Sequence, residues 1–268
     1  MSRRILIHPG FHKTGTSSMQ HFLWVNRDRL APQVGFLLLR HLKPAAKICM
    51  QFSATQNPYV LTDLVEVMDE TIATHIGADV ADLVISCEGL SGHLPGWGTL
   101  ESYAAAPIAA SYLTLYLAER FPDAEQRLVC STRDPEAWLW SAWRHHLMSH
   151  RPLQDWDEFA ARIRPAADLA SVAASVAEAV APVPVYTLPL EEATAHPQGP
   201  GGALLELLDL PEDLRATLRP VPPGNRGPDA ALAAQYLALN RSRLTDAAVK
   251  AEKLRLAEAA GVGGWANG

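Results

Sequence analysis

The sequence has few of the features that mark several common functional classes. It contains only three cysteines in 268 residues, Cys49, Cys87 and Cys130. An odd, widely spaced set of this kind does not indicate a disulfide framework, so we expect buried thiols in a reducing, cytoplasmic compartment. A metal site would need ligands at short spacing, which neither the cysteines nor the ten histidines provide. We therefore expect no bound metal.

Positive charge and long apolar runs are also lacking. The formal net charge is −6 and the basic residues form no continuous run, so no nucleic-acid partner is expected. No stretch reaches the length of a membrane span, and the apolar run before Pro9 is too short for a signal peptide. With 48% apolar residues, the chain is typical of a globular protein.

Five apolar runs of strand length alternate with helical patterns. This alternation predicts a three-layer α/β/α fold with a mostly parallel central sheet. We expect one domain over 1–268, with an α/β core over 1–190 and a mainly helical part over 191–268. A loop is predicted after Arg40 to Pro44, and the alanine-rich residues 155–181 are expected to be helical. The expected strands are Ile5 to Ile7, Val34 to Leu39, Leu83 to Cys87, Arg127 to Thr132 and Pro184 to Leu188.

The first strand leads into a short polar segment that precedes a helical pattern. Its residues are Lys13, Thr14, Gly15, Thr16, Ser17 and Ser18. A glycine-containing turn at a helix N-terminus presents unpaired N–H groups and the positive end of the helix dipole. Hydroxyl groups and one lysine add further donors and a charge. The segment therefore predicts a phosphate- or sulfate-binding loop.

The position of the lysine decides which kind of loop this is. Kinase and ATPase loops have Gly, four residues and then Gly-Lys-Ser/Thr, with the lysine at the end. Here Lys13 comes at the start, before Thr14-Gly15-Thr16. That arrangement resembles the 5'-phosphosulfate loop of the sulfotransferases that use 3'-phosphoadenosine 5'-phosphosulfate (PAPS).

A second segment strengthens this resemblance. Arg133-Asp134-Pro135 follows the fourth predicted strand, and Ser141 comes eight positions after the arginine. The spacing is similar to the family's 3'-phosphate signature. Asp134 is expected to cap the next helix and Pro135 to take its first position. The resemblance, to the bacterial and soluble type, covers roughly residues 5–150, and Ser86-Cys87-Glu88-Gly89-Leu90 is similar to that family's third-strand ending.

The resemblance implies a fold, a co-substrate and residue roles. PAPS would be the sulfuryl donor, with no metal required. Lys13 would stabilise charge on the departing phosphate oxygen, and the residues from Thr14 to Ser18 would hold the 5'-phosphate. The 3'-phosphate would be held by Arg133 and Ser141. A loop near 220–228, containing Asn225, Arg226 and Gly227, would close over the nucleotide.

The general base is predicted from position. In a parallel sheet, ligands bind in a crevice beyond the carboxyl ends of the strands. Glu88 follows a buried strand toward this crevice, and burial there would raise its proton affinity. His41 leaves another strand on that side, and His93 in Gly92-His93-Leu94-Pro95 is a third candidate. His12, His145 and His146 are expected to line or support the site. Trp97, Trp138, Trp140 and Trp143 are candidates for an acceptor wall or for stacking on adenine, although core packing is the usual role of tryptophans at helical spacing.

Two other functions stay open. A P-loop nucleotide kinase or NTPase would require a Gly-Lys-Ser/Thr ending and a magnesium-binding aspartate after an apolar strand, and neither pattern is present. A non-catalytic nucleotide-binding protein would keep the fold without needing Lys13. The acceptor, a small molecule or a glycan carrying a hydroxyl or amine, has no readable signature, and neither has the oligomeric state.

Overall fold

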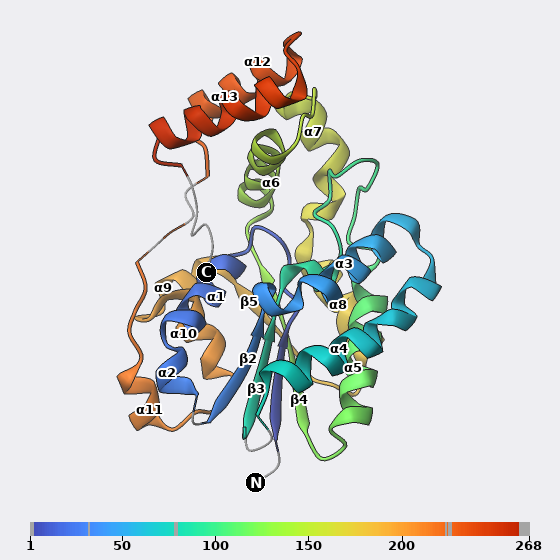
Figure 1. Ribbon diagram of the computed structural model, residues 1–268, viewed down its shortest axis with the longest axis vertical. Coiled ribbons are helices and arrows are strands. Elements are labelled where there is room, and N and C mark those ends of the chain that lie inside the picture. Colours follow the sequence, from blue (N-terminus) through green and yellow to red (C-terminus); the bar gives the residue numbers. More distant parts are fainter. Residues whose placement is uncertain (1–2, 32, 78–79, 223, 225–226, 263–268) are drawn as a thin grey trace.

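A central parallel sheet organises the molecule. The computed structural model describes residues 3–31, 33–77, 80–222, 224 and 227–262, and its five strands lie in the order β2-β3-β1-β4-β5 (Figure 1). Every strand pair is parallel. The predicted α/β fold and all five predicted strands are confirmed. The strands are β1 Arg4–His8, β2 Val34–Leu38, β3 Asp82–Ser86, β4 Glu125–Thr132 and β5 Val185–Pro189.

Helices cover both faces of this sheet. The α-helices are α1 Thr16–Val25, α2 Arg27–Leu30, α3 Leu39–Thr55, α4 Asp63–His75, α5 Ala106–Arg120, α6 Pro135–Ser149, α7 Trp156–Ile163, α8 Leu169–Val180, α9 Leu190–Ala195, α10 Gly199–Glu206, α11 Glu212–Thr217, α12 Ala230–Arg241 and α13 Asp246–Ala259. Three short 3-10 helices are η1 Pro58–Thr62, η2 Glu88–Ser91 and η3 Arg164–Ala167.

Alternation along the strands explains the layers. Successive side chains of a strand point to opposite faces, so Ile5 and Ile7 belong to one apolar cluster and Leu6 to another. The first cluster contains residues of α3, α4, α5 and α8, and the second contains residues of α1 and α10. Figure 1 shows these two groups of helices on opposite sides of the sheet, with α6, α7, α12 and α13 above the strands' carboxyl ends.

The connection after β2 corrects one prediction. The segment following Arg40 to Pro44 is not a loop, because α3 runs from Leu39 to Thr55 with Pro44 inside it. A proline inside a helix removes one hydrogen bond and costs about 3 kcal/mol. Burial of one apolar face offsets that cost. This face comprises Leu42, Ala45, Ala46, Cys49 and Phe52, together with Ser53.

The second half of the chain differs from expectation in its details. The region expected to be helical over 155–181 contains two helices, α7 and α8, separated by η3, which carries Pro165. Helix α10 begins at Gly199, within a proline- and glycine-rich stretch, while α9 and α11 were not predicted. Residues 242–245 separate α12, which ends at Arg241, from α13, which begins at Asp246.

The strand order creates a crevice at one place. Strand β1 lies between β3 and β4; the chain leaves β1 toward β2, on one side, and leaves β4 toward β5, on the other. In open parallel sheets, ligands bind beyond the carboxyl ends of strands whose connections diverge in this way. The segments that follow His8 and Thr132 therefore border the expected ligand position.

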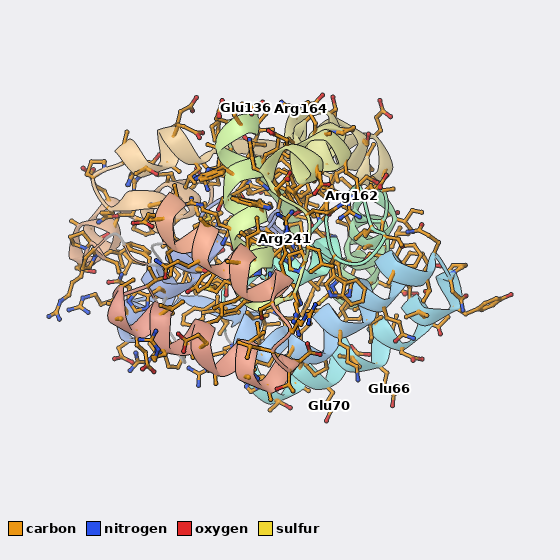
Figure 2. The ribbon with its side chains drawn as sticks, turned by 90° about the horizontal axis from the view of Figure 1, so that it is seen from above. Glu66, Glu70, Glu136, Arg162, Arg164 and Arg241 are labelled. Atoms are coloured by element: carbon orange, nitrogen blue, oxygen red, sulfur yellow. The ribbon has the colours of Figure 1, made fainter. Side chains whose placement is uncertain are left out.

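The remaining charged and thiol groups are peripheral or structural. Ion pairs such as Arg164 with Glu136 lie at the surface (Figure 2). All three cysteines are buried free thiols, as predicted. Within the described ranges, no helix is both long and apolar enough to cross a membrane, and no cluster of three acidic, histidine or cysteine side chains is placed to hold a metal ion.

Candidate active site

The loop between β1 and α1 has an unusual backbone. Gly15 is the N-cap of α1 with φ 90°, and it supplies no side-chain cap. A side chain at this φ is strained, and a Cβ atom at Gly15 would also lie 2.6 Å from Cδ1 of Leu190, so the position favours glycine. Lys13 also lies in the left-handed region, with φ 69°, which is strained for a residue with a side chain. Such strain persists only when surrounding contacts impose it.

Three successive carbonyl groups of this loop accept hydrogen bonds from side chains. The Thr14 hydroxyl donates to the carbonyl of Phe11 (2.5 Å), and the Trp138 indole N–H donates to that of His12 (2.8 Å). Arg133 Nη1 donates to the carbonyl of Lys13 (3.0 Å). Because these three carbonyl oxygens already accept hydrogen bonds from the protein, the loop can present its N–H groups and the Lys13 ammonium to an anion.

A buried chain of hydroxyl groups anchors the loop to the sheet. Because the Phe11 carbonyl only accepts, Thr14 donates to it and Ser131 donates to Thr14 Oγ1 (2.6 Å). His8 Nε2–H then donates to Ser131 (3.1 Å), and Ser86 donates to His8 Nδ1 (2.9 Å). Burial lowers the pKa of His8 to about 4, which keeps the ring neutral as this chain requires. The sequence offered no signal for this network.

Thr14 therefore differs from its predicted role. Its side chain is completely buried beneath the loop, and its hydroxyl bonds to Ser131 rather than facing a ligand. Thr14 follows Lys13 directly, as a magnesium-binding threonine follows the lysine in a kinase loop. However, its hydroxyl is already used, and α1 begins only at Thr16. The geometry at this position does not match a metal-binding P-loop.

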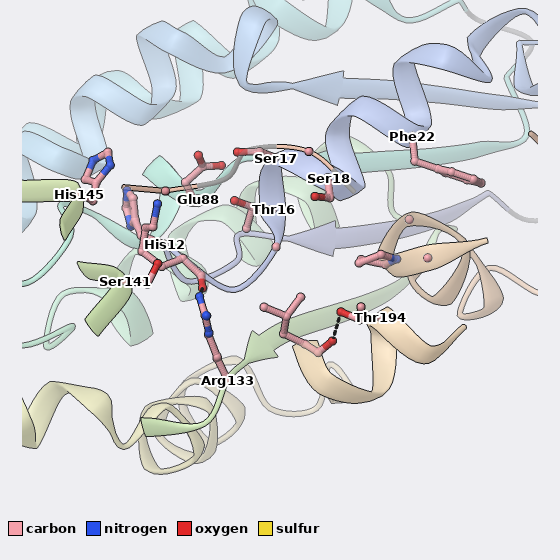
Figure 3. Close-up of a pocket in the computed structure, with 18 of the residues that line it drawn as sticks. His12, Thr16, Ser17, Ser18, Phe22, Glu88, Arg133, Ser141, His145 and Thr194 are labelled. Atoms are coloured by element: carbon pink, nitrogen blue, oxygen red, sulfur yellow. Dashed lines mark hydrogen bonds between the residues drawn. The ribbon is translucent and has the colours of Figure 1, made fainter. Parts of the chain in front are cut away.

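A cavity of about 480 Å³ opens beside the loop (Figure 3). It is lined by residues that follow the carboxyl ends of β1, β3 and β4 and by residues of α6, α9 and α10. The predicted residues that line it are Lys13, Gly15, Thr16, Ser17, Ser18, Glu88, Arg133, Ser141 and Gly227. Two further predicted residues, Asn225 and Arg226, lie outside the described residues.

Three cations and one carboxylate set the electrostatics of the cavity. The cations are Lys13, Arg133 and Arg144, and the carboxylate is Glu88. The pKa of Lys13 is lowered to about 8, mainly by burial and also by the charges of the two arginines, while Glu88 opposes the shift. Burial also lowers the pKa of each arginine. Positive charge held this way is stabilised when an anion enters.

One face of α6 forms a wall of the cavity, and the sequence analysis did not identify Arg144 as part of it. Ser141, Arg144, His145 and Met148 lie at i, i+3, i+4 and i+7, so all four point into the cavity. Arg144 also donates to the carbonyl of Pro228 and so ties that residue to α6. Its spacing from Ser141 was a usable signal, because side chains three apart share a helix face.

The start of α6 agrees with its prediction. The Asp134 carboxylate accepts from the Ala137 N–H (2.8 Å), and Pro135 is the first helical residue. The capped helix start fixes the direction in which the chain leaves β4. As a result, Arg133 turns toward the loop (Figure 3).

The three candidate bases lie in different places. Glu88 lines the cavity, and its Oε2 accepts from Gln20 Nε2 (2.8 Å). The residues that line the cavity include neither His41 nor His93. His41 Nδ1 accepts from the Leu38 N–H (3.1 Å) at the start of α3, and β2 is an edge strand, two strands away from β1. His93 stacks on Trp97 in a separate groove along α3.

Two of the histidines that were expected to line or support the site, and not to act as the base, line the cavity. They are His12 and His145. Burial is the main cause that lowers the pKa of both rings to about 3, with the Lys13 charge adding to it. They are neutral near pH 7. Their low proton affinity makes them poor bases, but each ring retains one N–H that can donate.

Comparison with known proteins gives limited information. No family model matches the chain, and no curated protein matches it. Among solved structures, a crystal structure of a sulfotransferase from Alicyclobacillus acidocaldarius is similar, with 16% sequence identity and a TM-score of 0.49. The similarity covers 97% of this chain and 96% of that one. We infer no function from a likeness at this level.

Proposed function

We propose that this protein is a sulfotransferase that moves a sulfuryl group from PAPS to a hydroxyl or amine of an acceptor. One observation carries the proposal: Lys13 and Arg133 leave neighbouring strands and line one cavity from two directions. Each has hydroxyl donors close by in the cavity wall, Ser17 and Ser18 for the first and Ser141 for the second. Two separate anion positions fit a donor that carries separated 5' and 3' phosphates.

The first anion position has the composition of a phosphosulfate site. The N-terminus of α1 has no side-chain cap. The Ser18 N–H donates to the Gly15 carbonyl (2.9 Å), but the N–H groups of Thr16 and Ser17 are open to a ligand, and the Ser17 and Ser18 hydroxyls add donors. Lys13 adds a mobile cation whose pKa near 8 leaves it mostly protonated at neutral pH. Anion binding raises that pKa, because the added negative charge favours the ammonium form.

The second anion position suits a phosphate monoester. Arg133 presents a planar, permanently charged group, and only one of its N–H donors is used on the Lys13 carbonyl. Ser141 and Arg144 approach from α6. Because Arg133 bonds the backbone of Lys13, filling one anion position also steadies the loop that forms the other.

Transfer requires three roles from the chain. The acceptor oxygen forms a bond to sulfur, the bond between sulfur and the 5'-phosphate oxygen breaks, and that oxygen keeps the electron pair. Lys13 stabilises the charge that develops on the departing oxygen. Glu88, oriented by Gln20, accepts the acceptor's proton. His12 and His145 add no charge and can donate to sulfuryl oxygens.

The test is a comparison of nucleotides by calorimetry. We expect 3'-phosphoadenosine 5'-phosphate (PAP) to bind about 10- to 100-fold more tightly than 5'-AMP, the range for hydrogen bonds to a charged group. We also expect PAP to bind more tightly than ATP with magnesium. Sulfuryl transfer from isotopically labelled PAPS, followed by mass, would complete the assignment. A clear preference for magnesium ATP would refute the proposal and favour a kinase or NTPase.

A further inference from the structure

A second concave surface runs along the outer face of α3. It has a volume of about 490 Å³ and is lined by α3 together with the segment after η2. Leu39, Ala46 and Met50 provide its apolar floor from successive turns of α3. Leu39 is 36% exposed and Trp97, on the opposite wall, is 38% exposed. Large apolar side chains gathered in one groove mark a binding surface rather than scattered surface residues. We call this surface the α3 groove.

The aromatic wall of the α3 groove is held in place. The rings of His93 and Trp97 stack with centroids 3.9 Å apart and an angle of 8°. The backbone N–H of His93 donates to Oγ of Ser53 on α3 (3.0 Å). Arg162 donates to the carbonyls of Gly96 and Gly98, on either side of Trp97. The groove therefore presents a fixed, flat aromatic surface suited to a ring.

The α3 groove begins next to the candidate base. The Leu39 N–H donates to Gln20 Oε1 (3.4 Å), and the same glutamine donates to Glu88 (2.8 Å). One side chain thus joins the groove's first residue to the carboxylate that lines the cavity. Glu88 also begins η2, and the chain that leaves η2 builds the aromatic wall. Glu88 lines the cavity, and through Gln20 it is linked to Leu39, which lines the groove.

Two lysines give the groove a positive edge. Lys43 and Lys47 line it, both are exposed, and neither forms an ion pair with any residue that the structure describes. Their apolar stems can lie along a ligand while the ammonium groups reach an anion. At 1.5 Å per residue, they lie about 6 and 12 Å along the helix from Leu39.

These features specify a kind of acceptor. We propose, on the basis of the sulfotransferase function above, that the α3 groove binds an acceptor with a flat apolar body, a hydroxyl group at the Leu39 end and an acidic group at Lys43 and Lys47. That hydroxyl meets the sulfuryl group beside Glu88, which takes its proton as the oxygen–sulfur bond forms. A glycan would need many hydrogen-bonding partners, whereas the uncharged polar side chains of the groove are Gln51 and His93.

The probe is 6-hydroxy-2-naphthoate, a fluorescent two-ring phenol with its acid at the far end. Its binding is followed by fluorescence without any donor, and PAP binding is measured separately by calorimetry. The methyl ester lacks the charge, and methyl glucoside represents a sugar. We expect the probe to bind at least tenfold more tightly than its ester, and methyl glucoside not to displace it.

Variants locate the binding. The double change K43E and K47E should weaken probe binding at least tenfold and leave ester binding unchanged, whereas W97A should weaken both. K250E, a reversal of an exposed lysine on α13, is the matched control. With labelled PAPS, the KM for the probe should rise in the same variants while the PAP affinity stays constant.

The two proposals fail in different ways. If the probe binds equally well to wild type, W97A and the double variant, or if methyl glucoside displaces it, the α3 groove is not the acceptor site, whatever PAP does. If PAP fails to bind while the probe shows the expected dependence on Trp97 and the lysines, the sulfotransferase function is refuted, and the acceptor role with it.

Discussion

The two cationic positions of the cavity, at the exits of β1 and β4, differ in how firmly they are built. Arg133 follows a regular strand, precedes a capped helix and donates to the Lys13 carbonyl. Lys13 lies on a strained backbone and carries an ammonium whose pKa is lowered to about 8. Arg133 is a fixed charge that already donates one hydrogen bond within the protein. The Lys13 ammonium is stabilised most when negative charge develops beside it. An interaction that is stronger in the transition state than in the ground state lowers the activation barrier.

The largest effect should come from removing the Lys13 charge. We expect K13A to lower kcat about 100- to 1000-fold, the usual loss when one donor to a developing oxyanion is removed. PAP affinity should fall much less. Steady-state kinetics with labelled PAPS measure kcat, and calorimetry measures affinity. K13R keeps the charge and should recover part of the rate. A kcat within about threefold of wild type in K13A would contradict the role of Lys13.

Arg133 should act mainly on binding. Loss of a charged hydrogen bond costs about 1.5 to 3 kcal/mol, so R133A should weaken PAP binding about 10- to 100-fold. At saturating donor, kcat should change less than in K13A. R133K retains the charge but loses the planar geometry and should lie between the two. If R133A and K13A lowered kcat equally, the two positions would act as one unit, and the contrast between them would be wrong.

The pH dependence should separate the two cations further. Because Lys13 must be protonated and its pKa is about 8, kcat/KM for the donor should fall above pH 8, about tenfold per unit. Arg133 stays charged and contributes no such decrease. Bound anionic donor raises the Lys13 pKa, so the decrease in kcat should begin at higher pH than that in kcat/KM. K13R should lose this decrease. Its persistence in K13R would assign the titration to another group.

Ser141 should have the smallest effect. A neutral hydroxyl contributes about 0.5 to 1.5 kcal/mol, so S141A should weaken PAP binding only about 2- to 10-fold, with kcat unchanged. S149A, at the end of the same helix and not among the residues lining the cavity, is the matched control. Equal PAP affinity in S141A and wild type would remove Ser141 from the second anion position.

The strands and the two motifs were readable because their signals are local. An apolar run that ends in Pro9-Gly10, or in Arg133-Asp134-Pro135, specifies a strand end and the loop or helix start within the next few residues. Parallel strands then bring their carboxyl ends to one edge of the sheet. That is why Lys13, Glu88 and Arg133 were expected near one another, and they do line one cavity.

His41 shows where this reasoning fails. It also follows a strand, but β2 is at the edge of the sheet and α3 begins at once, so its ring caps the helix. Strand order is set by long-range pairing, which residue spacing does not reveal. The α3 helix itself was missed for a related reason, because burial of one face outweighs the local cost of Pro44.

Short-range patterns encode the α/β fold, the loop with Lys13 and the helix start after Arg133, so each of these could be predicted from the amino-acid sequence. Long-range packing, in contrast, buries Thr14, brings Arg144 into the cavity and links Glu88 through Gln20 to the first residue of the α3 groove. The direction of a side chain depends on the groups that pack against it. These neighbours, such as Ser131 for Thr14 and Gln20 for Glu88, lie on other segments of the chain.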